Sequence, residues 1–221
     1  MHKNILIIGY GDIGRRLKTN IDNVNIYAVG RSSEEEDGIH KISWDWLSDK
    51  RLDLQNIFFD SIIIIPKPSE MTEEGYKNGF IKSINNINNS LFLKNFKQII
   101  AISSTRVYGS NQHGLLDENS PLNPSDYRGS TIKNYESILE KKYFGKLTIL
   151  RFSGLYDDLS QKMGHNKLHR NNAAKIIKFF INRDPDFKDN CIVNCSEDVK
   201  LDSSKKCISN KKIKDIGFKF Q

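Results

Sequence analysis

Three glycines follow the spacing Gly-x-Gly-x-x-Gly near the start of this 221-residue chain, at Gly9, Gly11 and Gly14. They come directly after a short apolar run and open a helix-compatible stretch, which is the context in which this spacing binds phosphate groups. The first glycine permits a tight turn, the second lets backbone approach a pyrophosphate, and the third allows close helix–strand packing. Free N–H groups at the start of the helix, around Asp12 and Ile13, would face the anion. The pattern predicts a dinucleotide-binding loop.

The second apolar run ends at Arg31 and Ser32, where the type of dinucleotide is normally read. A site for NAD places Asp or Glu there to bond the ribose 2′-hydroxyl. A guanidinium instead pairs with a 2′-phosphate, so NADP is expected in preference to NAD. The acidic residues 34–37 come a few positions later and are expected in a solvated loop. The alternative is that Arg31 simply ends a strand at the surface.

The elements that must position these residues are visible in the hydropathy pattern. Apolar runs typical of strands buried on both faces lie at 4–8, 25–29, 61–65, 99–103 and 147–152. Stretches with apolar residues at helical spacing lie between or after them, at 73–92, 128–143 and 172–181. Strands that alternate with amphipathic helices predict an α/β fold with a doubly wound parallel sheet.

The order of several motifs resembles that of the NAD(P)-dependent epimerase/dehydratases, the extended short-chain dehydrogenase/reductases with a Rossmann fold. The series comprises the glycine loop, Ile-Ser-Ser-Thr-Arg-Val-Tyr-Gly at 102–109, Asp-Glu-Asn-Ser-Pro at 117–121, Leu-Arg-Phe-Ser-Gly-Leu-Tyr at 150–156, and His-Arg-Asn-Asn-Ala-Ala at 169–174. A tail resembling the family's ending follows at 208–218. Because family members are commonly longer, the resemblance implies a reduced C-terminal substrate lobe.

The resemblance implies catalytic and binding roles for particular residues. Ser104, four residues before the Tyr-Gly of the middle motif, would hydrogen-bond a substrate oxygen during hydride transfer; the alternative is a serine that caps the strand end. Pro66 and Ser103 would lie beside the cofactor's nicotinamide end. Thr105 and Arg106 replace the Asp-Glu pair of the family's dehydratases, which argues against dehydration because no carboxylic acid is there to protonate a leaving hydroxyl.

The family's Tyr-x-x-x-Lys pair is missing from its usual place. Alignment on Glu136 puts those two positions at Arg128 and Ile132, and neither side chain can do the pair's chemistry. Tyr127 and Lys133 lie nearby but are six residues apart, so on a helix they point in different directions. One residue of slippage would bring Tyr127 inward as a replacement acid. The chain therefore resembles an atypical branch of the family.

Charge and cysteine content set the broader limits. Residues 161–221 hold 14 of the 34 basic and 7 of the 27 acidic residues, so the whole +7 excess lies in the C-terminal quarter. The expected organisation is a dinucleotide domain at 1–160 and a small lobe at 161–221, partly intertwined with it and effectively one domain.

All three cysteines follow residue 190 and are expected to be reduced and structural rather than metal ligands, in a cytoplasmic protein.

Three functions follow from these features. The first is an NADP-dependent oxidoreductase or epimerase acting on a small polar or nucleotide-linked substrate. The second is a non-catalytic cofactor-binding sensor or assembly protein, which the missing Tyr-x-x-x-Lys pair favours. The third, a nucleic-acid binder, is disfavoured because the basic tail lacks interleaved aromatic residues. No membrane span is expected, and the resemblance admits a homodimer through the helices at 73–92 and 128–143.

Overall fold

The computed structural model describes residues 2–32, 34–158, 165–183 and 191–220. Within these residues a seven-stranded sheet has the order β3-β2-β1-β4-β5-β7-β10, and every neighbouring pair is parallel. The strands are β1 (Lys3–Ile8), β2 (Val24–Gly30), β3 (Ile39–Ser43), β4 (Phe59–Ile64), β5 (Phe96–Ser104), β7 (Leu147–Phe152) and β10 (Cys191–Cys195). The order reverses between β1 and β4, which is where ligands bind in doubly wound sheets. The predicted fold class is confirmed.

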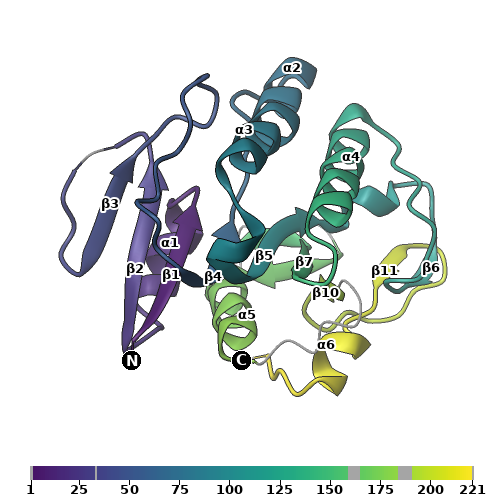
Figure 1. Ribbon diagram of the computed structural model, residues 1–221. Coiled ribbons are helices and arrows are strands. Elements are labelled where there is room, and N and C mark those ends of the chain that lie inside the picture. Colours follow the sequence, from purple (N-terminus) through teal and green to yellow (C-terminus); the bar gives the residue numbers. More distant parts are fainter. Residues whose placement is uncertain (1, 33, 159–164, 184–190, 221) are drawn as a thin grey trace.

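Helices cover both faces of this sheet (Figure 1). One face carries α2 (Glu73–Tyr76), a π-helical stretch (Lys77–Lys82), α3 (Ser83–Ser90) and α4 (Tyr127–Lys142). The other face carries α1 (Asp12–Lys18), α5 (Arg170–Asn182) and α6 (Lys211–Asp215). None of the helices in the described ranges is long and apolar enough to cross a membrane.

The isoleucine-rich strands supply both cores because successive side chains of a strand point to opposite faces. In β4, Ile62 and Ile64 pack toward α2, α3 and α4, whereas Ile63 between them packs toward α1 and α5. The same alternation in β1 places Leu6 and Ile8 on one side and Ile5 and Ile7 on the other. Strands with both faces covered therefore read as continuous apolar runs.

The C-terminal quarter is woven into the main fold. Strand β10 extends the sheet beside β7, and α5 packs against α1. Two small parallel pairs complete it: β6 (Gly114–Leu116) with β11 (Lys206–Ile208), and β8 (Gly154–Tyr156) with β9 (Lys167–His169). In Figure 1, β6 and β11 lie beyond α4. The boundary expected after residue 160 lies outside the described residues.

Candidate active site

The glycine loop lies at the switch point of the sheet and has the geometry that its spacing predicts. Gly9 has φ of +90°, and a Cβ there would lie 2.2 Å from the carbonyl oxygen of Ile65, at the end of β4. Only glycine meets both conditions. Gly11 is the N-cap of α1 and has no atom within 4 Å of a Cβ position, so its surface is open to a ligand. A Cβ on Gly14 would lie 2.9 Å from the ring of Tyr10, because helix and loop pack closely.

Asp12, the first residue of α1, joins a network of surface charges that links the loop to the C-terminal region. Its carboxylate accepts hydrogen bonds from Arg16 (3.0 Å) and Arg170 (2.8 Å). Both arginines also pair with Asp157, at 2.9 and 3.3 Å. Burial alone would raise the pKa of Asp12, but the hydrogen bonds and charges of the two arginines lower it. Ile13 points the other way and is buried in the core.

The end of β2 presents Arg31 and Ser32 to solvent. Arg31 forms no ion pair with any residue that the structure describes, so its guanidinium is available to a ligand phosphate. The neighbouring acidic loop is less free than its sequence suggests. Glu36 accepts a hydrogen bond from the hydroxyl of Tyr10 (2.7 Å) and pairs with Lys18 (3.2 Å). These contacts, chiefly the one from Tyr10, lower the pKa of Glu36.

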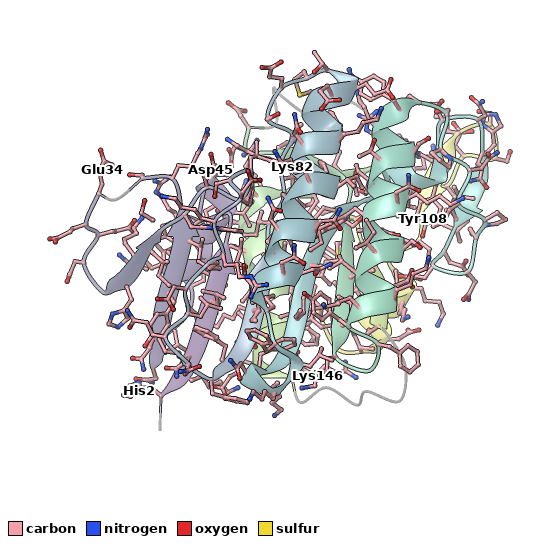
Figure 2. All side chains as sticks on the ribbon, turned by 45° about the horizontal axis from the view of Figure 1, so that its top comes forward. His2, Glu34, Asp45, Lys82, Tyr108 and Lys146 are labelled. Carbon is pink, nitrogen blue, oxygen red and sulfur yellow. The ribbon has the colours of Figure 1, made fainter. Side chains whose placement is uncertain are left out.

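Glu34 lies on the same loop and projects away from the body of the molecule (Figure 2). The acidic segment therefore combines an anchored carboxylate with exposed ones, rather than being solvated throughout.

A cavity of about 940 Å³ opens where β4, β5 and β7 end. Of the residues named from the sequence, it brings together Pro66, Ser103, Ser104, Thr105, Arg106 and Ile132. Its polar lining also includes residues that sequence reasoning did not assign to a site: Ser110, Ser125, Asp126, Asn166, Arg170 and Lys206. These come from turns, a helix cap and the short strands, whose place beside the sheet is set by tertiary packing. The resemblance pointed to the serine segment, and no local pattern marked the others.

Ser104 ends β5 and lines this cavity. Its Oγ accepts a hydrogen bond from the backbone N–H of Arg106 (3.2 Å), so the residue does cap the following turn. Within the described ranges the hydroxyl donates to no protein group, which leaves its proton for a ligand oxygen. The capping and ligand-binding interpretations of Ser104 are therefore compatible.

Ser103 has a different environment one residue earlier. Its hydroxyl donates to Glu136 (2.5 Å), a carboxylate that is paired with Arg151 (2.7 Å), and all three side chains are buried. Arg151 also donates to the hydroxyl of Tyr108 (2.9 Å), which in turn donates to Asn194 (2.9 Å). The side chains of Ser103 and Tyr108 thus belong to an internal network. Ser103 also borders the cavity, and its contact with a cofactor stays a prediction.

Tyr127, the predicted replacement acid, is the first residue of α4 and does not line the cavity. Its hydroxyl donates to the carbonyl oxygen of Met71 (3.0 Å) and accepts from Nε of Arg128 (3.3 Å). Its ring packs edge-on against Tyr76. The structure therefore does not bring Tyr127 and Ser104 together in the cavity, although Ile132 from the same helix is there.

The segment after β4, at residues 66–68, forms another wall of the cavity, and the π-helical stretch packs against it. The π-helical stretch brings Gly79 so close to the segment after β4 that a Cβ would lie 2.0 Å from the carbonyl oxygen of Lys67. This contact holds Pro66 and Pro68 in the lining, while the side chain of Lys67 is exposed and outside it.

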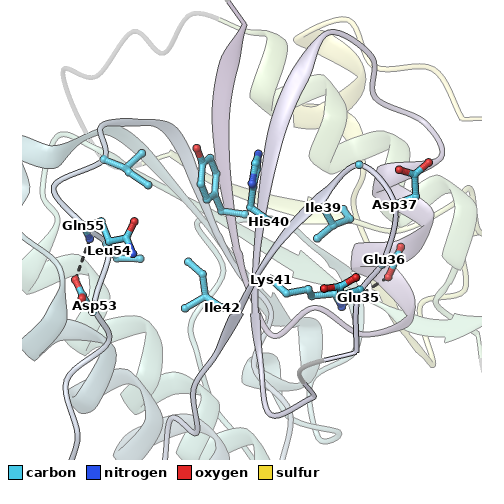
Figure 3. A pocket seen from close by; sticks show the side chains of 13 residues that line it. Glu35, Glu36, Asp37, Ile39, His40, Lys41, Ile42, Asp53, Leu54 and Gln55 are labelled. Atoms are coloured by element: carbon cyan, nitrogen blue, oxygen red, sulfur yellow. Dashed lines mark hydrogen bonds and ion pairs between the residues drawn. The ribbon is translucent and has the colours of Figure 1, made fainter.

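A second cavity, of about 1020 Å³, flanks β3 at the sheet edge (Figure 3). Its charged lining is mostly acidic, with Glu35, Glu36, Asp37 and Asp53 against Lys41. Acidic walls disfavour an anionic dinucleotide. Glu36 and Lys41 of this lining contact Tyr10 of the glycine loop, but Ser104 does not line this cavity. The two cavities are similar in volume, and the convergence of polar groups favours the one at the carboxyl ends of the strands.

The three cysteines are free thiols. Cys195 and Cys207 are buried and Cys191 is partly buried, which matches the expected structural role. In the parts of the chain that the structure describes, no group of three or more His, Cys, Asp or Glu side chains is placed to hold a metal ion.

No protein-family model matches the sequence, and a search of curated proteins finds no significant match. Solved structures do match. A Methylobacillus flagellatus protein described as an NAD-dependent epimerase/dehydratase superposes with a TM-score of 0.77 at 18% identity, over 100% of this chain and 93% of its own. The UDP-N-acetylglucosamine 4-epimerase of Methanobrevibacter ruminantium M1, solved with UDP-N-acetylmuramic acid, gives 0.75 at 15% identity, over 100% and 93%. UDP-glucuronic acid 4-epimerase of Bacillus cereus, solved with NAD, gives 0.71 at 14%, over 93% and 87%.

Identities this low establish a shared fold. The chain has the α/β fold of these proteins along nearly its whole length.

Proposed function

We propose that this protein binds a nicotinamide dinucleotide at the loop of residues 9–14 and acts as an oxidoreductase or epimerase on a polar substrate held in the 940 Å³ cavity. The observation that carries the proposal is the geometry of the loop. Gly9 turns at the switch point, the backbone around Gly11 is open, and the N-terminus of α1 faces the same space. Three solved neighbours named as epimerases or epimerase/dehydratases support it through their fold.

NADP is the proposed form of the cofactor. Arg31 and Ser32 stand exposed at the end of β2, and no carboxylate takes the position that would bond a ribose 2′-hydroxyl. Glu36, on the loop that follows, is held by Tyr10 and Lys18. The Bacillus cereus epimerase was solved in complex with NAD, so a protein of this fold can bind the form without a 2′-phosphate. A preference of this chain for NADP would therefore have to come from its own residues, and Arg31 is the residue we propose.

The bound dinucleotide would accept or donate a hydride. The residues of this chain would position the reacting partners. Pro66 and Phe152 border the cavity beside the strand ends, and Ser104 offers a hydroxyl proton to a substrate oxygen. Because the Methanobrevibacter ruminantium epimerase was solved in complex with UDP-N-acetylmuramic acid, a nucleotide-linked substrate is part of the proposal.

A second candidate function is cofactor binding without turnover, as in a sensor or assembly protein. The placement of Tyr127 favours it, since the hydroxyl bonds Met71 and does not line the cavity. In this second function, Ser104 and the cavity would still bind a ligand, but no tyrosine acid would complete the reaction.

One experiment separates the two functions. Purified protein is titrated with NADPH and NADH. Net oxidation is followed at roughly 340 nm, the wavelength at which reduced nicotinamide absorbs, across carbonyl compounds, and conversion of nucleotide sugars to their epimers, which consumes no cofactor overall, is followed by NMR. Turnover that is lost in Ser104→Ala but kept in Ser130→Ala, a control at an exposed serine of α4 outside the cavity lining, supports the enzyme. Binding without turnover on any substrate supports the sensor, and failure to bind either dinucleotide contradicts both functions.

A further inference from the structure

The cavity lining contains two cations that lie near each other, Arg106 from the turn after β5 and Lys206 from β11. The first belongs to the dinucleotide-binding half of the chain and the second to the C-terminal quarter. The guanidinium of Arg106 is close enough to affect the ammonium of Lys206. Burial first, and then the charge of Arg106, lower the pKa of Lys206, while Asp126 acts in the opposite sense.

Both cations are held in place by the same turn. The N–H of Arg106 donates to Ser104 Oγ (3.2 Å), and its carbonyl oxygen accepts from the N–H of Gly109 (2.9 Å). Lys206 Nζ donates to the carbonyl oxygen of Gly109 (2.6 Å). Gly109 has φ of +74°, and a Cβ there would lie 2.0 Å from the carbonyl oxygen of Asn123. Only glycine fits at this position of the turn.

The strand that carries Lys206 is also fixed. Asn166, itself in the cavity lining, donates from Nδ2 to the carbonyl oxygen of Lys206 (2.8 Å) and accepts from the N–H of Ile208 (2.7 Å). The backbone that carries Lys206 is therefore fixed, and this places the ammonium group of Lys206 in the cavity lining.

The nearby carboxylate, that of Asp126, pairs with Arg106 and leaves Lys206 without an ion-pair partner among the described residues. Asp126 Oδ2 pairs with Arg106 (3.1 Å), while its Oδ1 caps α4 by accepting from the N–H of Gly129 (2.8 Å). Lys206 forms no ion pair within the described part of the chain and bonds only a carbonyl oxygen. Arg170, a third cation of the lining, is already paired with Asp12 and Asp157. A partly buried ammonium beside a guanidinium attracts an anionic ligand group.

We infer that Arg106 and Lys206 form a subsite for the anionic group of the substrate, a phosphate or a carboxylate, whose reacting oxygen is then presented to Ser104. This inference rests on the proposed function for the part played by Ser104, but the anion subsite is a property of the apoprotein. It identifies the substrate as one that carries a negative charge a short distance from its reacting carbon.

The test uses inorganic phosphate, acetate and glycerol as phosphate, carboxylate and neutral probes. Each is titrated at constant ionic strength into isotope-labelled full-length protein, and the NMR shifts of backbone amides in residues 104–110 are followed. We expect one or both anions to shift these amides saturably and glycerol not to. The stronger anion identifies which charged group the subsite prefers.

Variants assign the effect to the two cations. Arg106→Gln and Lys206→Gln should each weaken anion binding roughly tenfold, the scale of a lost charge-assisted hydrogen bond, and Lys206→Arg should retain it. The matched control is Lys205→Gln, which removes an adjacent lysine that is 60% exposed and pairs with Asp202. The inference is overturned if neither anion shifts residues 104–110, or if Lys205→Gln weakens binding as much as Lys206→Gln does.

Dinucleotide binding, measured on the same samples, keeps the two proposals distinct. Anion binding without NADPH binding would leave the subsite standing and contradict the proposed function. NADPH binding without anion binding would do the reverse. NADPH affinity that falls with Arg106→Gln and Lys206→Gln would instead assign these cations to the cofactor and overturn the substrate subsite.

Discussion

Glu136 and Arg151 form an ion pair whose side chains are only 2% exposed. The guanidinium of Arg151 also donates a hydrogen bond to the hydroxyl of Tyr108, and Glu136 also accepts one from the hydroxyl of Ser103. Ion pairs at this depth satisfy one another without adding much net stability, but removal of one partner leaves a buried charge uncompensated. The network therefore explains why two residues of the serine–tyrosine motif face the interior, and it fixes β5, α4 and β7 beside the cavity.

Arg151→Met is expected to lower the free energy of unfolding by about 3–5 kcal/mol, because Glu136 would remain buried and unpaired. The double variant Glu136→Leu with Arg151→Met removes both charges and should recover most of that loss. Urea unfolding followed by circular dichroism measures both. Equal losses in the single and the double variant would show that the pair acts through packing rather than charge.

Under the proposed function, the choice of cofactor depends on Arg31. Arg31→Asp replaces a donor for a 2′-phosphate by an acceptor for a 2′-hydroxyl, so NADPH affinity should fall by roughly 10- to 100-fold, corresponding to one charge-assisted contact. NADH affinity should rise. Fluorescence titration of both dinucleotides checks the change, and a ratio that stays the same would place the 2′-phosphate elsewhere.

At the scale of elements, the loop between β1 and α1 offers a matched pair of substitutions. Gly9→Ala should destabilise the protein, because φ is +90° and the new Cβ would lie 2.2 Å from the oxygen of Ile65. Gly11→Ala has no neighbour within 4 Å and should leave the melting temperature nearly unchanged. It should nevertheless weaken dinucleotide binding, since the methyl group occupies the space that a pyrophosphate needs.

Thermal unfolding and NADPH titration of both variants check this prediction. If Gly11→Ala bound NADPH as tightly as the wild type, the loop would not be the phosphate site.

The elements also show how far the sequence could be interpreted. The predicted run at 147–152 matches β7 at both ends, and the expected helix at 128–143 is shifted by one residue from Tyr127–Lys142. These segments have strong apolar periodicity. Strand β3 was not predicted, because its residues are only partly buried or exposed and its pattern is weak. Lys206 and Asn166 lie far from Ser104 in the chain, and only the pairing of β6 with β11 and the packing around it bring them together.

At the scale of the whole molecule, the four charges of Asp12, Arg16, Asp157 and Arg170 join the start of α1 to the start of α5. All four are partly exposed, so their effect on stability is small. Under the proposed function they would affect the cofactor more, because they lie beside the glycine loop. Arg16 and Arg170 offset the negative charge of Asp12, which would otherwise repel a pyrophosphate.

Arg170→Gln is accordingly expected to change the free energy of unfolding by less than about 1 kcal/mol and to reduce NADPH affinity severalfold. The pKa of Asp12 is lowered in the folded state, so its pairing contributes stability above the carboxyl's ordinary pKa and loses it as the pH falls through the lowered value. Unfolding curves at neutral and acidic pH should therefore converge for wild type and Arg170→Gln as acidity increases. A gap that widened toward acid would contradict this account.

A homodimer through the helices at 73–92 and 128–143, which comprise α2, the π-helical stretch, α3 and α4, remains a prediction at this scale. Their exposed residues include Asn85, Asn89, Lys133 and Asn134, so an interface here would be polar. Sedimentation equilibrium gives the mass directly, and a monomer at every concentration would reject the prediction.

The central claim is that the loop of residues 9–14 binds a nicotinamide dinucleotide. Isothermal titration calorimetry of NADPH and NADH against the wild type and Gly11→Ala tests it most directly. The account predicts one site per chain, tighter binding of NADPH than of NADH, and marked weakening in Gly11→Ala with the fold intact. Absence of binding by both dinucleotides to folded wild-type protein would contradict it.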